Sequence, residues 1–306
     1  MDNGEYRRQG YDHVSGTGRG VRMTRPDFVV AAPPETGGTR LVATLARHPG
    51  LRLTAPRQAT AAAVPADQHR TPSEPGGAPA GDAWGIDGAT GVEDGPAVPA
   101  GSRHGVVAPY LLADFAAQRR LHECTAYPRL LVALRDPIDR AYAAWRRART
   151  TGTEPLADFV AALLAEPERA RAGYGWAWRY AELGRYGGQL RKLYTLYSPG
   201  QVLLVHYPDL VAGPAAVFDR ACGFLGVRKG AARDPRFELA AGAGTGAGLA
   251  DEPGQSADRP PPDLRARAVE LFQEDIRLLE SVTHRSFGAW LTPSGGPAPV
   301  ARAADI

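Results

Sequence analysis

The chain has 306 residues, 43% of them hydrophobic, which is enough to form the core of one large α/β domain. Its formal net charge of +3 does not indicate nucleic-acid binding, and no segment has the length and apolar character of a membrane span, so we expect neither as a partner. The two cysteines, Cys124 and Cys222, fit a reducing compartment, and we expect a cytoplasmic protein.

The first part of the chain contains one strand, one helix and a long unpatterned segment. Residues 1–24 are polar and lack periodicity, which is typical of a disordered tail. Residues 27–32 are a short apolar run that predicts a buried strand, and residues 39–48 place their apolar side chains on one helical face. Residues 59–105 are dominated by Ala, Pro and Gly, and we expect a disordered insertion there.

Strands and helices alternate after Val106. We predict strands at 129–134 and 201–206, and helices at 109–124, 137–145, 156–164, 186–197, 215–225 and 263–281, with a loose segment at 231–262. Residues 293–306 are expected to be a disordered tail. This alternation predicts a single α/β domain over residues 25–292, with a parallel β-sheet of about four or five strands flanked by helices. Ligands are then expected at the carboxyl ends of the strands.

Four stretches in order resemble a known family: residues 26–51 (PDFVVAAPPETGGTRLVATLARHPGL), 128–145 (PRLLVALRDPIDRAYAAW), 186–227 and 264–290. Together they resemble the sulfotransferases that use 3′-phosphoadenosine 5′-phosphosulfate (PAPS) and act on carbohydrates and bacterial small molecules. The resemblance implies a P-loop-NTPase-like fold, PAPS as co-substrate without a metal, and a small-molecule or carbohydrate acceptor.

The first stretch has the outline of a phosphate-binding loop between a strand and a helix. Gly37 and Gly38 allow an anion to approach the backbone closely, the helix N-terminus offers N–H groups, and Thr39 can add a hydroxyl donor. An ordinary capped helix, with Thr36 or Thr39 as the capping residue, would give the same pattern. The resemblance implies that Thr36, Gly37, Gly38 and Thr39 bind the cofactor.

Arg135 follows the strand at 129–134, at the end where ligands are expected. The resemblance implies that Arg135 binds the 3′-phosphate of the cofactor, a task that suits the planar, bidentate guanidinium. The alternative is a salt bridge at the start of the helix, to Asp136 or Asp139.

The sequence departs from the family pattern at polar positions. Glu35 stands where the family has a Lys or Arg that contacts the phosphosulfate, and a carboxylate there would repel the cofactor unless it is paired, protonated or turned away. Since the chain contains only two lysines, we expect arginine to replace the missing cation. Arg40 could pair with Glu35 or face the phosphate, and Arg57 is a second candidate. The other departures are Gln58, Val107 and Ala143.

The sequence leaves open which residue acts as the general base. Gln58 cannot accept a proton, and the remaining candidates are His48, His104, Glu123 and His206. We expect His48 to be structural and favour His104, because it lies in a segment expected to be flexible and just before a motif that lines the active cleft in the family.

Three functions remain. The first is sulfuryl transfer from PAPS to a hydroxyl or amine, with Arg40, Arg57 and His104 as catalytic residues. The second is a catalytically impaired protein of the same fold that binds nucleotide or acts as a scaffold partner. A nucleotide kinase is disfavoured, because no Gly-Lys-Ser/Thr follows the loop.

Overall fold

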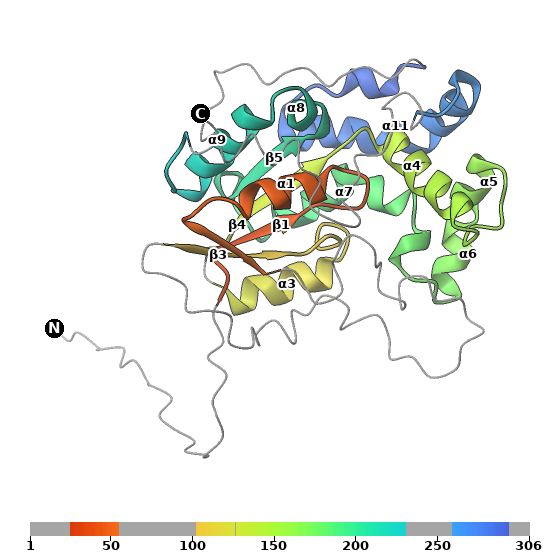
Figure 1. Ribbon diagram of the computed structural model, residues 1–306. Helices are drawn as coiled ribbons and strands as arrows, with labels where there is room; N and C mark the ends of the chain where they lie inside the picture. Colours follow the sequence, from red (N-terminus) through yellow and green to blue (C-terminus); the bar gives the residue numbers. More distant parts are fainter. Residues whose placement is uncertain (1–24, 55–101, 126, 231–258, 294–306) are drawn as a thin grey trace, which may run out of the picture.

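The computed structural model describes residues 25–54, 102–125, 127–230 and 259–293. In this part of the chain, five parallel strands form one sheet in the order β2-β3-β1-β4-β5. They are β1 (Phe28–Ala31), β2 (Leu51–Thr54), β3 (Arg103–Val107), β4 (Arg129–Leu134) and β5 (Val202–His206). β1 lies in the centre, so the segment that follows it leaves the middle of the carboxyl edge of the sheet (Figure 1).

Helices cover both faces of the sheet because alternate strand residues point to opposite faces and most of them are apolar. Val29 packs in one buried cluster and Phe28 in the other. The Val29 cluster includes side chains of α3 (Phe115–Cys124), α4 (Pro137–Thr150), α5 (Phe159–Leu164), α7 (Tyr186–Leu193) and α11 (Pro262–Thr283). The Phe28 cluster includes side chains of α1 (Gly38–Leu45), α8 (Tyr207–Ala212) and α9 (Pro214–Leu225).

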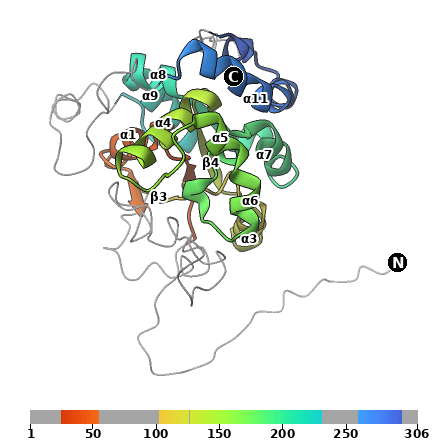
Figure 2. The same cartoon turned by 90° about the vertical axis from the view of Figure 1, so that its right-hand side faces the viewer.

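Short elements complete the described part of the chain. α6 (Glu166–Arg171) follows α5, and both lie beyond α4 at one end of the molecule (Figures 1 and 2). Four 3-10 turns connect the longer elements: Trp176–Trp178, Glu182–Gly184, Pro199–Gln201 and Gly288–Leu291. The fold is therefore a three-layer α/β arrangement around one parallel sheet, as the sequence predicts.

The sequence analysis missed two strands, the edge strand β2 and its neighbour β3. β2 has the residues LRLT, and β3 has RHGVV, which contains a glycine and two polar residues. Neither run is long or apolar enough to predict a strand by itself. Gly105 in β3 is required by packing, because a Cβ there would lie 2.2 Å from the Phe28 ring of β1. The segment 59–105, predicted to be an unstructured insertion, therefore overlaps β3 at residues 103–105.

Other boundaries differ by a few residues. The helix predicted at 109–124 begins at Phe115, because residues 110–113 form a turn. The helix predicted at 156–164 begins at Phe159, where the Asp158 carboxylate caps it by accepting from Val160 and Ala161 N–H. The predicted segment 1–24 and most of 59–105, 231–262 and 293–306 lie outside the described residues.

Candidate functional site

The loop between β1 and α1, residues 32–37, is tightly folded at the centre of the carboxyl edge. Glu35 and Gly37 both have left-handed backbone, with φ of 69° and 78°. The Thr36 side chain is fully buried, and its hydroxyl donates to the Pro33 carbonyl at 2.6 Å. The Thr36 hydroxyl therefore holds the loop together.

Both glycines of the loop are needed for close packing. A Cβ on Gly37 would lie 2.8 Å from the Tyr207 ring, and one on Gly38 would lie 2.5 Å from the Cβ of Ala32. Gly38 begins α1, and the first N–H groups of a helix have no partner inside that helix. This tight turn therefore places the backbone N–H groups and the positive end of the α1 dipole together at the end of the loop.

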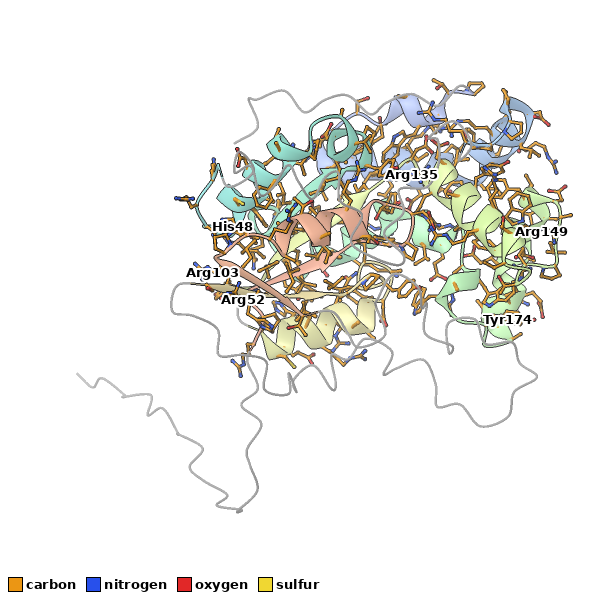
Figure 3. All side chains as sticks on the ribbon, viewed as in Figure 1. His48, Arg52, Arg103, Arg135, Arg149 and Tyr174 are labelled. Carbon is orange, nitrogen blue, oxygen red and sulfur yellow. The ribbon has the colours of Figure 1, made fainter. Side chains whose placement is uncertain are left out.

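Arg135, at the end of β4, reaches this loop. Its guanidinium donates to the Glu35 carbonyl at 3.1 Å and lies over the Tyr207 ring at 4.7 Å from the ring centroid. Arg135 is only 6% exposed. The side chain lies near the middle of the molecule in Figure 3. Arg135 therefore lies next to the loop, as the sequence predicts. Its contacts with Glu35 and Tyr207 form within the chain itself and do not need a ligand.

Asp136 and Asp139, the carboxylates proposed as alternative partners of Arg135, both form salt bridges with Arg265. Arg265 of α11, which is 2% exposed, donates to Asp136 at 2.5 Å and to Asp139 at 2.7 Å. It also donates to the Trp290 carbonyl at 2.8 Å. Arg265 thus ties the start of α4 to the C-terminal helix.

The two carboxylates bound by Arg265 are buried next to each other. Asp136 also caps α4, accepting from Ile138 and Asp139 N–H. Burial and the neighbouring Asp136 carboxylate raise the pKa of Asp139 to about 6, although Arg265 opposes this rise. This cluster fixes the first turn of α4, which directly follows Arg135.

Two further arginines of α4 reach the loop. Arg140 is fully buried and donates to the Tyr180 carbonyl, with a second, longer contact of 3.5 Å to the Pro34 carbonyl. Arg147 forms an ion pair with Glu35, at 3.1 Å between Nη2 and Oε1. The carboxylate that the sequence places where a cation is expected is therefore paired with a cation from α4.

Two of the other predicted site residues lie beside the loop. Thr39 is exposed and Arg40 half-buried, both in the first turn of α1 beside the loop. Arg57 lies outside the described residues. The structure thus brings together the loop, Arg40 and Arg135, which were all assigned from the sequence.

The position of His104 differs from the one predicted for the general base. It lies in β3 and not in a flexible segment, and its register places it at the amino end of the sheet, where its carbonyl accepts from Asp27 N–H. The four-residue strand β1 separates this edge from the loop by about 13 Å. Arg103, the preceding residue, lies far from Arg135 in Figure 3. His104 is also buried and contacts the Thr54 hydroxyl at 3.0 Å, so it does not lie where a base for a ligand at the loop is needed.

The remaining base candidates have structural surroundings. His48 accepts from Gly50 N–H and lies 3.0 Å from the Arg228 carbonyl, as expected for a structural residue. Glu123 is exposed on α3 and pairs with Arg119 at 3.6 Å. His206 ends β5 at the carboxyl edge, where it stacks on the Phe287 ring, and burial lowers its pKa to about 4.

Three residues of the site were not assigned from the sequence: Tyr207, Arg147 and Arg265. Tyr207 belongs to the third family-like stretch, which could have identified it. Arg147 and Arg265 have no local signal, since an arginine on a helix is usually exposed to solvent. In the described ranges, no group of three or more His, Cys, Asp or Glu side chains could hold a metal ion. No helix within these ranges is long and apolar enough to cross a membrane.

Comparison with solved structures identifies the fold. The chain is similar to the crystal structure of a sulfotransferase from Alicyclobacillus acidocaldarius, with a TM-score of 0.62 and 23% sequence identity. The match covers 87% of this chain and 99% of that one. The chain therefore has the fold of a sulfotransferase, a P-loop-like α/β fold with a parallel sheet flanked by helices.

Two other solved structures match less closely. A mouse sulfotransferase complexed with PAP has a TM-score of 0.49 and 12% identity, over 86% of this chain and 90% of that one. The sulfotransferase domain from the Synechococcus PCC 7002 olefin synthase has a TM-score of 0.46 and 16% identity, over 88% and 98%. The fold assignment does not depend on either. Neither a family model nor a curated protein matches the sequence.

Proposed function

We propose that this protein is a PAPS-dependent sulfotransferase that moves a sulfuryl group to a hydroxyl or amine of a carbohydrate or small-molecule acceptor. The observation that carries the proposal is the meeting of the glycine loop and Arg135 at one point of the carboxyl edge. It occurs in a chain with the fold of a sulfotransferase.

The residues present fit an anionic nucleotide. Gly38 begins α1, and the N–H groups at this helix start favour an anion. The backbone of residues 36–39 and the Thr39 hydroxyl would hold the 5′-phosphosulfate, and Arg135 would hold the 3′-phosphate. The cofactor supplies the sulfuryl group, and the loop stabilises the charge that develops on the departing phosphate oxygen.

The catalytic cations and the base belong to the proposal. Arg40, in the first turn of α1, is one candidate for the catalytic cation, and Arg57 is the other. No base is assigned among the described residues, since His104 lies at the opposite edge of the sheet. We further propose that the protein works in the cytoplasm and without a metal ion.

A titration with PAP, the desulfonated cofactor, tests this proposal. We expect PAP to bind the wild-type protein with micromolar or better affinity by calorimetry. Arg135→Ala should weaken binding by about 1.5–3 kcal/mol, because it removes hydrogen bonds to a charged group. Arg119→Ala, which removes an exposed arginine of α3, is the matched control and should bind as the wild type does. Absence of binding at millimolar PAP would refute the function.

The alternative is a protein that binds nucleotide or acts as a scaffold partner but does not transfer sulfate. The observation that favours it is Glu35, whose carboxylate occupies the loop position of the usual cation. A transfer assay with labelled PAPS and a broad panel of hydroxyl and amine acceptors separates the two functions. Labelled product supports the enzyme and eliminates the alternative, whereas PAP binding without transfer to any acceptor supports the alternative.

A further inference from the structure

The ion pair between Glu35 and Arg147 is asymmetric in its exposure to solvent. The Glu35 side chain is 9% exposed, whereas the Arg147 side chain is 52% exposed. Glu35 is held at two points, because its carbonyl accepts from Arg135 and its carboxylate accepts from Arg147. The buried partner is thus the anion, and the partner that solvent reaches is the cation.

The backbone at Glu35 is consistent with a specific role. Its left-handed φ of 69° is uncommon for a residue other than glycine and persists only where the surroundings hold it. Two arginines from the β4–α4 unit provide this hold, one at each end of the residue. A carboxylate fixed in this way cannot turn into solvent without breaking its contact with Arg147.

Arg147 differs from the other arginine that α4 directs at the loop. Arg140 and Arg147 are seven residues apart, which is about two turns, so they share one face of α4. Arg140 is fully buried and contacts backbone carbonyls, which is a structural role. The Arg147 side chain is 52% exposed although it is paired with Glu35 of the loop. A guanidinium has five N–H donors and can bind a carboxylate and a second anion together.

We propose that Arg147 is the cation of the phosphosulfate subsite and that Glu35 is the anchor that holds its guanidinium at the loop. This inference rests on the proposed function and adds to it a residue that comes from α4. It accounts for the carboxylate in the loop, because the ion pair cancels the charge of Glu35 and the carboxylate holds the guanidinium where it can donate to the anion.

Glu35→Lys distinguishes this arrangement from a loop that is merely disabled by a carboxylate. If Glu35 only repels the cofactor, Glu35→Lys should bind PAP more tightly than the wild type. If Glu35 anchors Arg147, the new lysine repels the guanidinium, and we expect PAP binding to weaken or stay the same. A tenfold or larger gain in affinity for Glu35→Lys would overturn the inference.

A double-mutant cycle, measured by calorimetry with PAP, tests the role of Arg147 directly. We expect Arg147→Gln to raise the Kd at least tenfold, Arg147→Lys to raise it less, and the control Arg119→Gln to leave it unchanged. In Glu35→Gln/Arg147→Gln the Kd should stay as high as in Arg147→Gln, because the contact with the anion is missing. Recovery of wild-type affinity in the double variant would show that Arg147 only neutralises Glu35, and would overturn the inference.

Pyrophosphate, as a probe without the nucleoside, separates this inference from the proposed function. If pyrophosphate binds in a manner that depends on Arg147 but PAP does not bind, the proposed function fails and the anion subsite stands. If PAP binds equally well to the wild type and to Arg147→Gln, the function stands and the inference fails. If neither probe binds the wild type, both fail. Circular dichroism of each variant confirms that it is folded.

Discussion

At the scale of single residues, Glu35 in the loop leads to different conclusions from the sequence and from the structure. From the sequence, Glu35 is a carboxylate at a place that should bind an anion. In the structure it is a buried member of an ion pair, with its carbonyl bound by Arg135. The effect of a charged residue on a binding site therefore depends on its partner, and here the partner is 112 residues away in the sequence.

His206 leads to a prediction about pH. It is 6% exposed, and burial, with smaller effects of Arg285 and Arg220, lowers its pKa from 6.5 to about 4. Because the unfolded chain binds this proton more strongly, the stability from neutral His206 is complete above pH 6.5. It is lost as the pH falls toward 4, at a cost of about 3 kcal/mol in the free energy of unfolding.

The measurement is denaturant unfolding at several pH values between 7 and 4. His206→Phe keeps a ring beside Phe287 and cannot titrate, so its stability should fall less steeply with pH than that of the wild type. His122→Gln, at an exposed position of α3, is the control and should follow the wild-type curve. Equal slopes for His206→Phe and the wild type would contradict the assignment to His206.

At the scale of secondary-structure elements, the C-terminal helix organises the half of the molecule that carries Arg135. α11 provides Arg265, which binds the two carboxylates at the start of α4. It also provides Asp275, whose carboxylate accepts from Gly187 and Gly188 N–H at the start of α7, at 2.8 Å each. One helix thus caps a second and anchors a third, by contacts across 87 to 129 positions of sequence.

The α7–α11 contact can be tested with two neighbouring glycines. A Cβ on Gly187 would lie 2.3 Å from the Asp275 carbonyl oxygen, so Gly187→Ala should separate the helices and destabilise the protein by about 1–3 kcal/mol. A Cβ on Gly188 would lie 3.4 Å from the Asp275 carboxylate, an ordinary contact. Gly188→Ala should therefore be neutral or stabilising by up to about 1 kcal/mol. Thermal unfolding measures both, and equal effects would contradict the packing described here.

At the scale of the whole molecule, the two buried clusters are on opposite faces of one sheet and contain residues from Phe28 to Trp290. Trp290 is 1% exposed, and its carbonyl and that of Thr292 accept from Arg265. The folded unit therefore extends at least to residue 292, and the domain limits of 25–292 stay a prediction.

Truncation tests this limit. A chain of residues 25–292 should unfold cooperatively, with a Tm within a few degrees of that of the full chain, since about 1 kcal/mol shifts the Tm of such a domain by 2–4 °C. A chain of residues 25–288 loses the buried Trp290 and two carbonyl partners of Arg265, and it should be destabilised by several kcal/mol. Equal stability of both chains would contradict this account, as would unfolding of the 25–292 chain.

Local patterns in the sequence determined most of the fold. The apolar runs of β1, β4 and β5, the glycine loop after β1 and the helix stop at Gly226 can each be read from a few neighbouring residues. They predict the parallel sheet, the loop and Arg135 at its carboxyl edge, because hydrophobic periodicity and turn chemistry act over short distances.

Only the tertiary structure decided how the charges are paired. β2 pairs with β3, and β3 pairs with β1. This pairing places His104 at the edge of the sheet opposite the loop. The partners of Glu35, Asp136 and Asp139 come from helices far along the chain. An ion pair depends on the distance between two side chains in space, and no local sequence pattern encodes that distance.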